Sequence, residues 1–177
     1  MMINKLSYGN ILLRPLEPED LELLYQWEND LSVWLVSNTL IPFSKYTIEQ
    51  FILNSGKDIF ETRQLRLIIE NLEGLPVGTI DLFDFEPFHQ RAGVGILIYN
   101  NEDRQKGYAY NSLRMICLYA SKILRIHQLY ANIAIGNSCS TNLFKKVGFQ
   151  PLGIKKEWIK TAEGWEDEIL FQKIFSE

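Results

Sequence analysis

The sequence has few of the residues from which proteins build metal centres and disulfide frameworks. Its 177 residues include two cysteines and two histidines. Cys117 and Cys139 lie far apart, and no CxxC pair is present. Metal-binding clusters and disulfide scaffolds both need such residues at short, repeated spacings. We therefore expect no metal ion, no disulfide and a reducing, cytoplasmic location.

Long apolar runs and an excess of positive charge are also missing. No run approaches the roughly 20 apolar residues that span a bilayer, and residues 1–8 lack the apolar core of a signal peptide. The net charge is −4, whereas nucleic-acid-binding proteins carry basic surfaces. We therefore expect no membrane and no nucleic acid as partner. A neutral or cationic substrate is easier to accommodate than an anionic one.

The common nucleotide-binding fingerprints are absent, while the bulk composition is that of a globular domain. The chain contains neither GxxxxGK[ST] nor GxGxxG, the marks of P-loop and dinucleotide sites. Apolar residues make up 46% and charged residues 23%, both close to average. A chain of this length buries enough surface to fold without cross-links. We predict a single domain over residues 1–177.

Hydrophobic periodicity predicts a mixed α/β fold with helices on both faces of the sheet. Apolar and polar residues alternate over 64–70, which is typical of a strand. Residues 109–124 repeat apolar side chains at helical spacing. Residues 31–44 have no period and are expected to form a loop. The predicted strands cover residues 10–16, 64–70, 76–85, 91–99, 127–135, 150–159 and 165–175, and the predicted helices begin at Pro18, Thr47, Gly107 and Ser140.

A short basic turn joins the strand ending at Tyr99 to the long helix. It carries Arg104 and Lys106, and Gly107 stands where the helix begins. The first N–H groups of a helix have no partner inside it, and they lie at the positive end of the helix dipole. An anion such as phosphate binds there, and a glycine lets it approach the backbone. A solvated surface loop would have the same composition.

Two motifs resemble those of the GNAT acyltransferases. The turn fits R/Q-x-x-G-x-G/A, with Arg104, Gly107 and Ala109 at the motif positions. About thirty residues later, the segment 137–149 resembles the family's N-x-x-S/A … K-x-G-F pattern. The opening Leu13-Arg-Pro-Leu-Glu-Pro-Glu-Asp20 is similar to the branch that contains ribosomal-protein N-acetyltransferases and spermidine acetyltransferases. Together these segments extend the resemblance over nearly the whole chain.

The resemblance implies a fold and a co-substrate. The family has a mixed, mostly antiparallel sheet of six to seven strands, in which two parallel neighbours splay apart to admit acetyl-CoA. Here these would be the strands 91–99 and 127–135. The pantetheine would pair with the freed backbone edge, the pyrophosphate would bind the turn, and residues 137 and 140 would contact the CoA arm. The residues implied for acetyl-CoA are Leu97, Ile98, Tyr99, Arg104, Gln105, Lys106, Gly107, Tyr108, Ala109, Asn137 and Ser140.

Two positions depart from the family's catalytic pattern. Many relatives carry a proton-donating Tyr where this chain has Phe144, and a Glu where it has Gly93. Glycine inside a strand also indicates a bulge, a packing kink or a close approach to the backbone. The acids that remain nearby are Asp81, Asp84 and Glu86, and of these Asp84 and Glu86 are the predicted base or amine-binding groups. A solvated strand end is the alternative role for both.

The resemblance implies acetyl transfer to a primary amine, by direct attack in a ternary complex. The acceptor site would be walled by Trp34, Asn38, Phe83 and Phe85. Aromatic and acidic residues suit a polyamine, and a small amine or a protein N-terminus is equally compatible. Relatives are often homodimers. Two alternatives stay open: a CoA-binding sensor or partner domain with little transferase activity, and an unrelated nucleotide-binding α/β protein.

Overall fold

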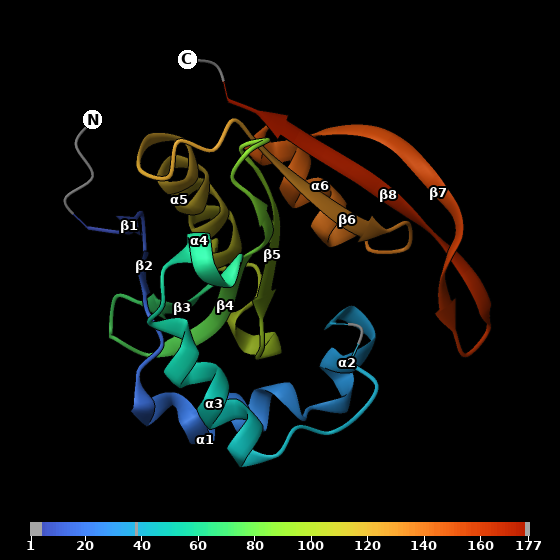
Figure 1. The fold of residues 1–177 in the computed structure, drawn as a ribbon. Helices are drawn as coiled ribbons and strands as arrows, with labels where there is room; N and C mark the ends of the chain where they lie inside the picture. The colour runs from blue at the N-terminus through green and yellow to red at the C-terminus, as the bar shows by residue number, and fades with distance from the viewer. Residues whose placement is uncertain (1–4, 38, 176–177) are drawn as a thin grey trace.

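A computed structural model describes residues 5–37 and 39–175. Its centre is a mixed, mostly antiparallel sheet with the strand order β1-β2-β3-β4-β5-β6-β8-β7, shown in Figure 1. The strands are β1 (Ser7–Tyr8), β2 (Ile11–Arg14), β3 (Leu65–Asn71), β4 (Pro76–Glu86), β5 (Arg91–Ile98), β6 (Gln128–Ala134), β7 (Gln150–Thr161) and β8 (Gly164–Ile174). The predicted fold class is confirmed, with the two-residue β1 as an additional strand.

The helices cover both faces of this sheet, as expected. Short 3-10 turns precede α1 and α5. The helical elements are η1 (Pro18–Asp20), α1 (Leu21–Glu28), α2 (Leu31–Ser37), α3 (Lys45–Ser55), α4 (Ile59–Thr62), η2 (Asn101–Asp103), α5 (Tyr108–Lys122) and α6 (Ser138–Val147). The long hairpin β7–β8 extends away from the remainder of the molecule (Figure 1).

The first helical region differs from the sequence prediction in two places. Residues 31–37 form α2 instead of a loop, and the Trp34 indole N–H donates to the Glu28 carbonyl at 2.9 Å. The third helix begins at Lys45 instead of Thr47, because the Ser44 hydroxyl accepts from the Thr47 N–H at 3.1 Å. The predicted start of this helix at Thr47 was therefore two residues too late. Both errors come from local capping and tertiary contacts that override periodicity.

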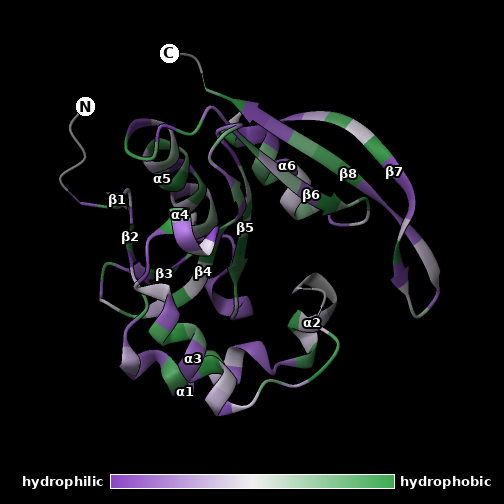
Figure 2. Ribbon diagram, in the orientation of Figure 1, coloured by the Kyte–Doolittle hydropathy of each residue, from purple (hydrophilic) through white to green (hydrophobic). Residues whose placement is uncertain are grey.

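The two faces of β3 explain how one strand serves two cores. Leu67 and Ile69 are buried with α5 and the middle of the sheet. Ile68 is buried on the opposite face with α1 and α3, in a cluster that includes Leu24 and Trp27. Successive side chains of a strand point to opposite faces, so this continuous apolar run is covered on both sides. Figure 2 shows the hydrophobic residues gathered in the central strands and in the helices packed on them.

Strands β5 and β6 are parallel neighbours, but they are paired over a short length. The register joins Arg91 to Gln128, Ala92 to Leu129 and Gly93 to Tyr130. Beyond Gly93, β5 continues along β4 to Ile98, while β6 continues along β8 to Ala134. The two strands therefore diverge, as the resemblance implied (Figure 1).

A buried ion-pair network fixes the N-terminal segment to the sheet edge. Arg14 of β2 donates to both carboxylate oxygens of Asp20, at 2.7 and 2.8 Å, and also pairs with Glu70 of β3. Asp20 is 5% exposed. Burial by itself raises the pKa of Asp20, but the Arg14 guanidinium and the Glu17 N–H lower it below its ordinary value. The network is therefore stabilising while Asp20 stays ionised.

We predict that Asp20→Asn destabilises the protein by about 3 kcal/mol, because it leaves Arg14 with an incomplete set of partners. Because the pKa of Asp20 is lowered by folding, its ionised form adds stability at pH values above its unfolded pKa of about 4. This stability is lost as the pH falls from about 4 through the lower pKa of the folded state. Urea unfolding between pH 3 and 7 measures both effects. Glu22→Gln, which removes an exposed pair with Lys45, should stay within about 1 kcal/mol of wild type. Equal losses in both variants would contradict this interpretation.

Candidate functional site

A cavity lies where β5 and β6 diverge. It has a volume of about 1140 Å³. Its lining comes from both diverging strands, from α1, α2, β3 and β4 on one side, and from α6 and the β7–β8 hairpin on the other. We call this cavity the cleft. The charged residues that line it are Glu28, Arg66, Asp81, Lys155, Glu166 and Glu168.

A row of cross-strand neighbours forms the floor of the cleft. Arg66 of β3 lies opposite Asp81 of β4, and Asp81 lies opposite Gly95 of β5. Directly opposed residues share one face of a sheet, so all three face the cleft. Gly95 lies two residues beyond the last pair between β5 and β6. The row therefore brings a carboxylate beside the point where the strands separate.

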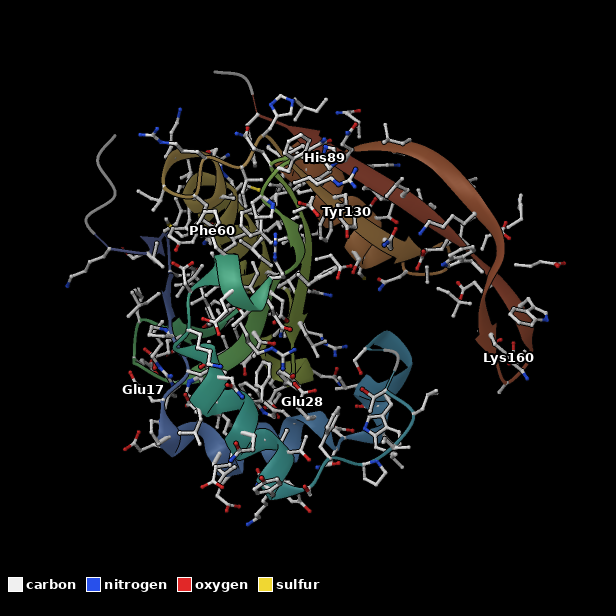
Figure 3. The ribbon with its side chains drawn as sticks, in the orientation of Figure 1. Glu17, Glu28, Phe60, His89, Tyr130 and Lys160 are labelled. Carbon is white, nitrogen blue, oxygen red and sulfur yellow. The ribbon has the colours of Figure 1, made fainter. Side chains whose placement is uncertain are left out.

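Glu28, Arg66 and Asp81 form a three-residue ion cluster in this floor. The Arg66 guanidinium donates to Glu28 at 2.5 Å and to Asp81 at 2.6 Å. Burial lowers the pKa of Arg66, but the two carboxylates raise it by more, so the side chain stays charged. Two carboxylates and one guanidinium leave one uncompensated negative charge. Figure 3 shows Glu28 near the open end of the diverging strands and Tyr130 near the end where they are paired.

Tyr99 completes this side of the cleft. Its ring stacks on Trp27 with the centroids 4.0 Å apart and the planes at 11°. Burial and then the negative charge of Glu28 raise the pKa of the Tyr99 phenol well above its usual value. Tyr99 therefore stays neutral at physiological pH and adds no negative charge to the floor.

Phe83 explains the glycine at position 93. A Cβ at Gly93 would lie 2.2 Å from Cε2 of Phe83, which is closer than any real contact allows. The Phe83 ring also meets Tyr130 edge-on, with the centroids 6.0 Å apart. The close approach that the sequence indicated is therefore made by an aromatic ring from β4. That ring occupies the space into which a Glu side chain at position 93 would project.

The opposite wall of the cleft carries a second group of charges on β7 and β8. Lys155 donates to Glu168 at 2.7 Å and to Asn132 at 2.8 Å. Its ammonium also lies 4.9 Å from the centroid of Trp158, a ring that is 60% exposed. Glu166 accepts from the Gly136 N–H at 2.7 Å. Lys155, Glu166 and Glu168 together contribute one further negative charge to the cleft.

The basic turn has the geometry of an anion-binding helix start. Helix α5 begins at Tyr108, and Gly107 precedes it with a φ of 84°, a left-handed conformation that favours glycine. Within the described residues no side chain caps this end, so the first N–H groups of α5 point outward. Lys106 pairs with Asp103 at 3.0 Å, and the Nε of Arg104 donates to the Ile98 carbonyl at 3.4 Å. These features fit a pyrophosphate.

Asn137 has the role of a helix cap, and it also faces the cleft. Its side-chain oxygen accepts from the Ser140 N–H at 3.0 Å, at the start of α6. Asn137, Ser140 and Phe144 all line the cleft. The Phe144 ring is 3% exposed and packs edge-on against Phe149. A phenyl ring has no proton to donate, so α6 supplies no acid here.

The predicted CoA residues gather along one route. Leu97, Tyr99, Asn137 and Ser140 line the cleft. The side chain of Ile98 is buried in the core. The residues 104–107 form the exposed turn beyond β5, and the last two predicted residues, Tyr108 and Ala109, are the first of α5.

The predicted acids lie elsewhere. Asp84 is an exposed residue with a φ of 48°, and it accepts from the Tyr130 hydroxyl at 3.3 Å. Glu86 lies 4.0 Å from Arg63. Neither residue lines the cleft, because the register of β4 shifts between Phe83 and Glu86 and turns this end of the strand away. Their catalytic role remains a prediction that this placement does not support.

The predicted acceptor wall is only partly reproduced. Phe83 lines the cleft. Phe85 is 4% exposed and packs edge-on against Phe60, so it belongs to the core. Trp34 is held by its hydrogen bond to Glu28 and is not among the lining residues. Asn38 lies outside the described residues.

The charged residues that form the floor of the cleft were not predicted from the sequence as site residues. Arg66 and Asp81 are charged residues inside otherwise apolar strands, and a buried charge needs a partner. A regular count back from the β3–β4 turn would have placed Arg66 opposite Ile80, because the register shifts between Ile69 and Glu70. Glu28 is separated from Arg66 by 38 residues, and no local pattern connects them.

Neither a metal centre nor a membrane-crossing helix is found in the described ranges. Residues 5–37 and 39–175 contain no group of three or more His, Cys, Asp or Glu that could hold a metal ion. Within the same ranges, every helix is too short or too polar to cross a bilayer.

Comparison with known proteins identifies residues 10–150 as an acetyltransferase (GNAT) domain. Spermidine N(1)-acetyltransferase of Escherichia coli (strain K12) is 27% identical over 150 residues, which cover 83% of this chain and 76% of the relative. The Vibrio cholerae protein of the same name is 25% identical over 144 residues, with coverages of 80% and 79%.

A solved structure shares this fold. The crystal structure of spermidine N-acetyltransferase from Vibrio cholerae, in complex with CoA and spermine, matches with a TM-score of 0.84. Its sequence is 21% identical, and the match covers 93% of this chain and 95% of the other. At this identity the likeness shows the fold.

We predict that Gly93→Ala costs about 1–3 kcal/mol, because its Cβ overlaps the Phe83 ring. Gly95→Ala is the matched control on the same strand: its Cβ would lie 3.7 Å from Phe83, an ordinary contact, so the cost should stay under about 1 kcal/mol. In a Phe83→Ala background the cost of Gly93→Ala should nearly vanish, which a double-mutant cycle of unfolding free energies measures. An undiminished cost in that background would show that the ring is not the obstacle.

Proposed function

The chain belongs to the GNAT acetyltransferase family, and we propose that it transfers the acetyl group of acetyl-CoA to a primary amine of a polycationic acceptor. The observation that carries this proposal is the anionic floor of the cleft, in which Glu28 and Asp81 flank Arg66 beside Gly95. An amine with further ammonium groups is attracted to a cleft that is net negative on both walls. The names of the curated relatives, which are spermidine acetyltransferases, agree with a polyamine.

We propose that the donor lies along β5 and the turn beyond it. Leu97, Ile98 and Tyr99 would follow the pantetheine, since β5 has no strand partner on the cleft side after Gly93. The N–H groups of Gly107 to Ala109 would hold the pyrophosphate, with charge added by Arg104 and Lys106. Asn137 and Ser140 would contact the arm from α6. When bound, acetyl-CoA supplies the activated acyl carbon and a thiolate leaving group.

The residues of the floor would orient the acceptor. Asp81 and Glu28 attract the ammonium groups and hold the reacting amine beside Gly95, where the absence of a side chain leaves room for the thioester. Orientation of this kind accounts for a large part of the acceleration in two-substrate reactions. With phenylalanine at position 144, the proton for the thiolate comes from solvent or from the amine itself, not from α6.

The alternative function is CoA binding without efficient transfer. Phe144 favours it, because α6 carries no acid. The glycine at position 93 does not favour this alternative, because Phe83 occupies the space that a Glu side chain would need. Thiol release from acetyl-CoA, measured with polyamines, monoamines and peptide N-termini, separates the two functions. Tight CoA binding without thiol release from any acceptor would favour the alternative.

Three further expectations belong to this proposal. The chain would act as a single domain over residues 1–177, it would work in the cytoplasm, and it would not need nucleic acid or a membrane. A homodimer stays a prediction from the family. Size-exclusion chromatography with light scattering measures the oligomeric state.

We predict that Asp81→Asn raises KM for a polyamine by about tenfold, because one charged contact to an ammonium is lost. The affinity for CoA should be unchanged, since Asp81 lies on the acceptor side. Glu73→Gln, in the exposed β3–β4 turn, removes an equal charge and should alter neither constant. Melting temperatures show whether Arg66 and the fold tolerate the change.

Asp84→Asn tests the acid predicted from the sequence against Asp81. If the amine depends on Asp84, as the sequence indicated, this variant will lose activity and Asp81→Asn will not. That result would show that the floor residues do not bind the acceptor. Unchanged KM in a well-folded Asp81→Asn protein would do the same.

A further inference from the structure

The side chain of Lys155 fills a site on the hairpin wall of the cleft that has the composition of an ammonium receptor. Its Nζ donates to a carboxylate oxygen of Glu168 at 2.7 Å and to the side-chain oxygen of Asn132 at 2.8 Å. The same atom lies 4.9 Å from the ring centroid of Trp158. A carboxylate, a second acceptor oxygen and an aromatic ring are groups that bind a primary ammonium. The protein's own lysine is therefore bound as an amine ligand would be bound.

The pairing of the strands places the polar groups of this site on one face of the sheet. Lys155 lies opposite Glu168, and Glu168 lies opposite Ala134 on its other side. Directly opposed residues share a face. Asn132 precedes Ala134 by two residues on β6 and lies on that face as well. All four residues line the cleft.

An irregularity in β7 brings Trp158 to the same side. In a regular strand, residues three positions apart point to opposite faces, which would turn Trp158 away from Lys155. The register of β7 on β8 shifts between Lys155 and Ile159, and Glu157 has a φ of 50°, in the left-handed region. Bulges of this kind redirect side chains. Trp158 lines the cleft together with Lys155, and 60% of its surface is exposed.

We infer that Lys155 is a specificity-determining residue, which occupies an ammonium site of the cleft and so disfavours acceptors that carry one ammonium group more. The inference rests on the proposed function, because it assumes that a polycationic acceptor enters the cleft. Glu166 and Glu168 give this wall two negative charges, of which Lys155 compensates one. A tethered ammonium competes at a high effective concentration. A longer polyamine would have to displace it or leave its own additional group unpaired.

The test compares spermidine, a triamine, with spermine, a tetraamine. Calorimetry with and without CoA measures binding, and thiol release from acetyl-CoA measures KM. Lys155→Met removes the charge and keeps a long, unbranched side chain, so the affinity for spermine should rise about tenfold relative to that for spermidine. Adding Glu168→Gln to Lys155→Met should abolish this gain, because the emptied site then has no carboxylate.

Lys156→Met is the matched control. Lys156 is the next residue of the hairpin, pairs with Asp167 at 2.7 Å and does not line the cleft. Its loss changes the net charge of the hairpin by the same amount, so the wild-type ratio of the two affinities should be kept. Lys155→Met leaves the buried Glu168 without its partner. Lys155→Gln, whose amide can still donate to Glu168, is therefore the second test variant, and melting temperatures check the fold of each.

The outcomes separate this inference from the proposed function. No rise in the affinity for spermine relative to spermidine, in folded Lys155→Met and Lys155→Gln, would overturn the role of Lys155 whether or not the protein transfers acetyl groups. An equal rise in Lys156→Met would overturn it too, by showing a general effect of charge. A rise that depends on Glu168, without thiol release from any acceptor, would instead support the ammonium site and refute the proposed transfer.

Discussion

Three residue pairs between β5 and β6 decide the architecture of the site. Parallel pairing stops at Gly93 and Tyr130, yet both strands continue, because each has a full partner on its other edge. Strand β5 is held by β4 as far as Ile98, and β6 is held by β8 as far as Ala134. A sheet can therefore open in its middle without fraying. The backbone groups left unpaired along β5 are what a donor with amide groups would need.

Close packing at the closed end and free space at the open end follow from two glycines with different surroundings. The Phe83 ring lies over Gly93 and leaves no room there for a side chain. Gly95 has space above it and lies beside Asp81. The carboxylate beside this part of β5 therefore comes from the neighbouring strand β4. In the proposed function, electrostatic attraction would bring the amine in as a cation, and the ammonium would pass a proton to solvent before its nitrogen attacks the thioester.

Much of this could be predicted from the sequence, and the failures have physical causes. Strong periodicity gave all the strands except β1, and the long helix α5, to within a few residues. A helix start after the basic turn was predicted at Gly107, and Gly107 precedes α5 in the left-handed conformation; anion binding there stays a prediction. The helix α2 was missed because its stability comes from contacts such as Trp34 with Glu28, which periodicity does not contain. Asp84 and Glu86 were predicted as the acids nearest the missing Glu at position 93, whereas the register shift after Phe83 turns them away from the cleft. Glu28 reaches Arg66 only through the folded chain.

The order of elements along the chain separates the two halves of the cleft. Every residue of the anionic floor, from Trp27 and Glu28 to Tyr99, precedes the basic turn. The turn, α5 and α6 follow it, and β5 is the strand that both halves share. Substitutions at Glu28, Arg66 or Asp81 would therefore alter the floor while the residues proposed for the donor, which all lie from Leu97 onward, keep their sequence. In evolutionary terms, the residues that contact the acceptor could change while the residues that bind the donor are conserved.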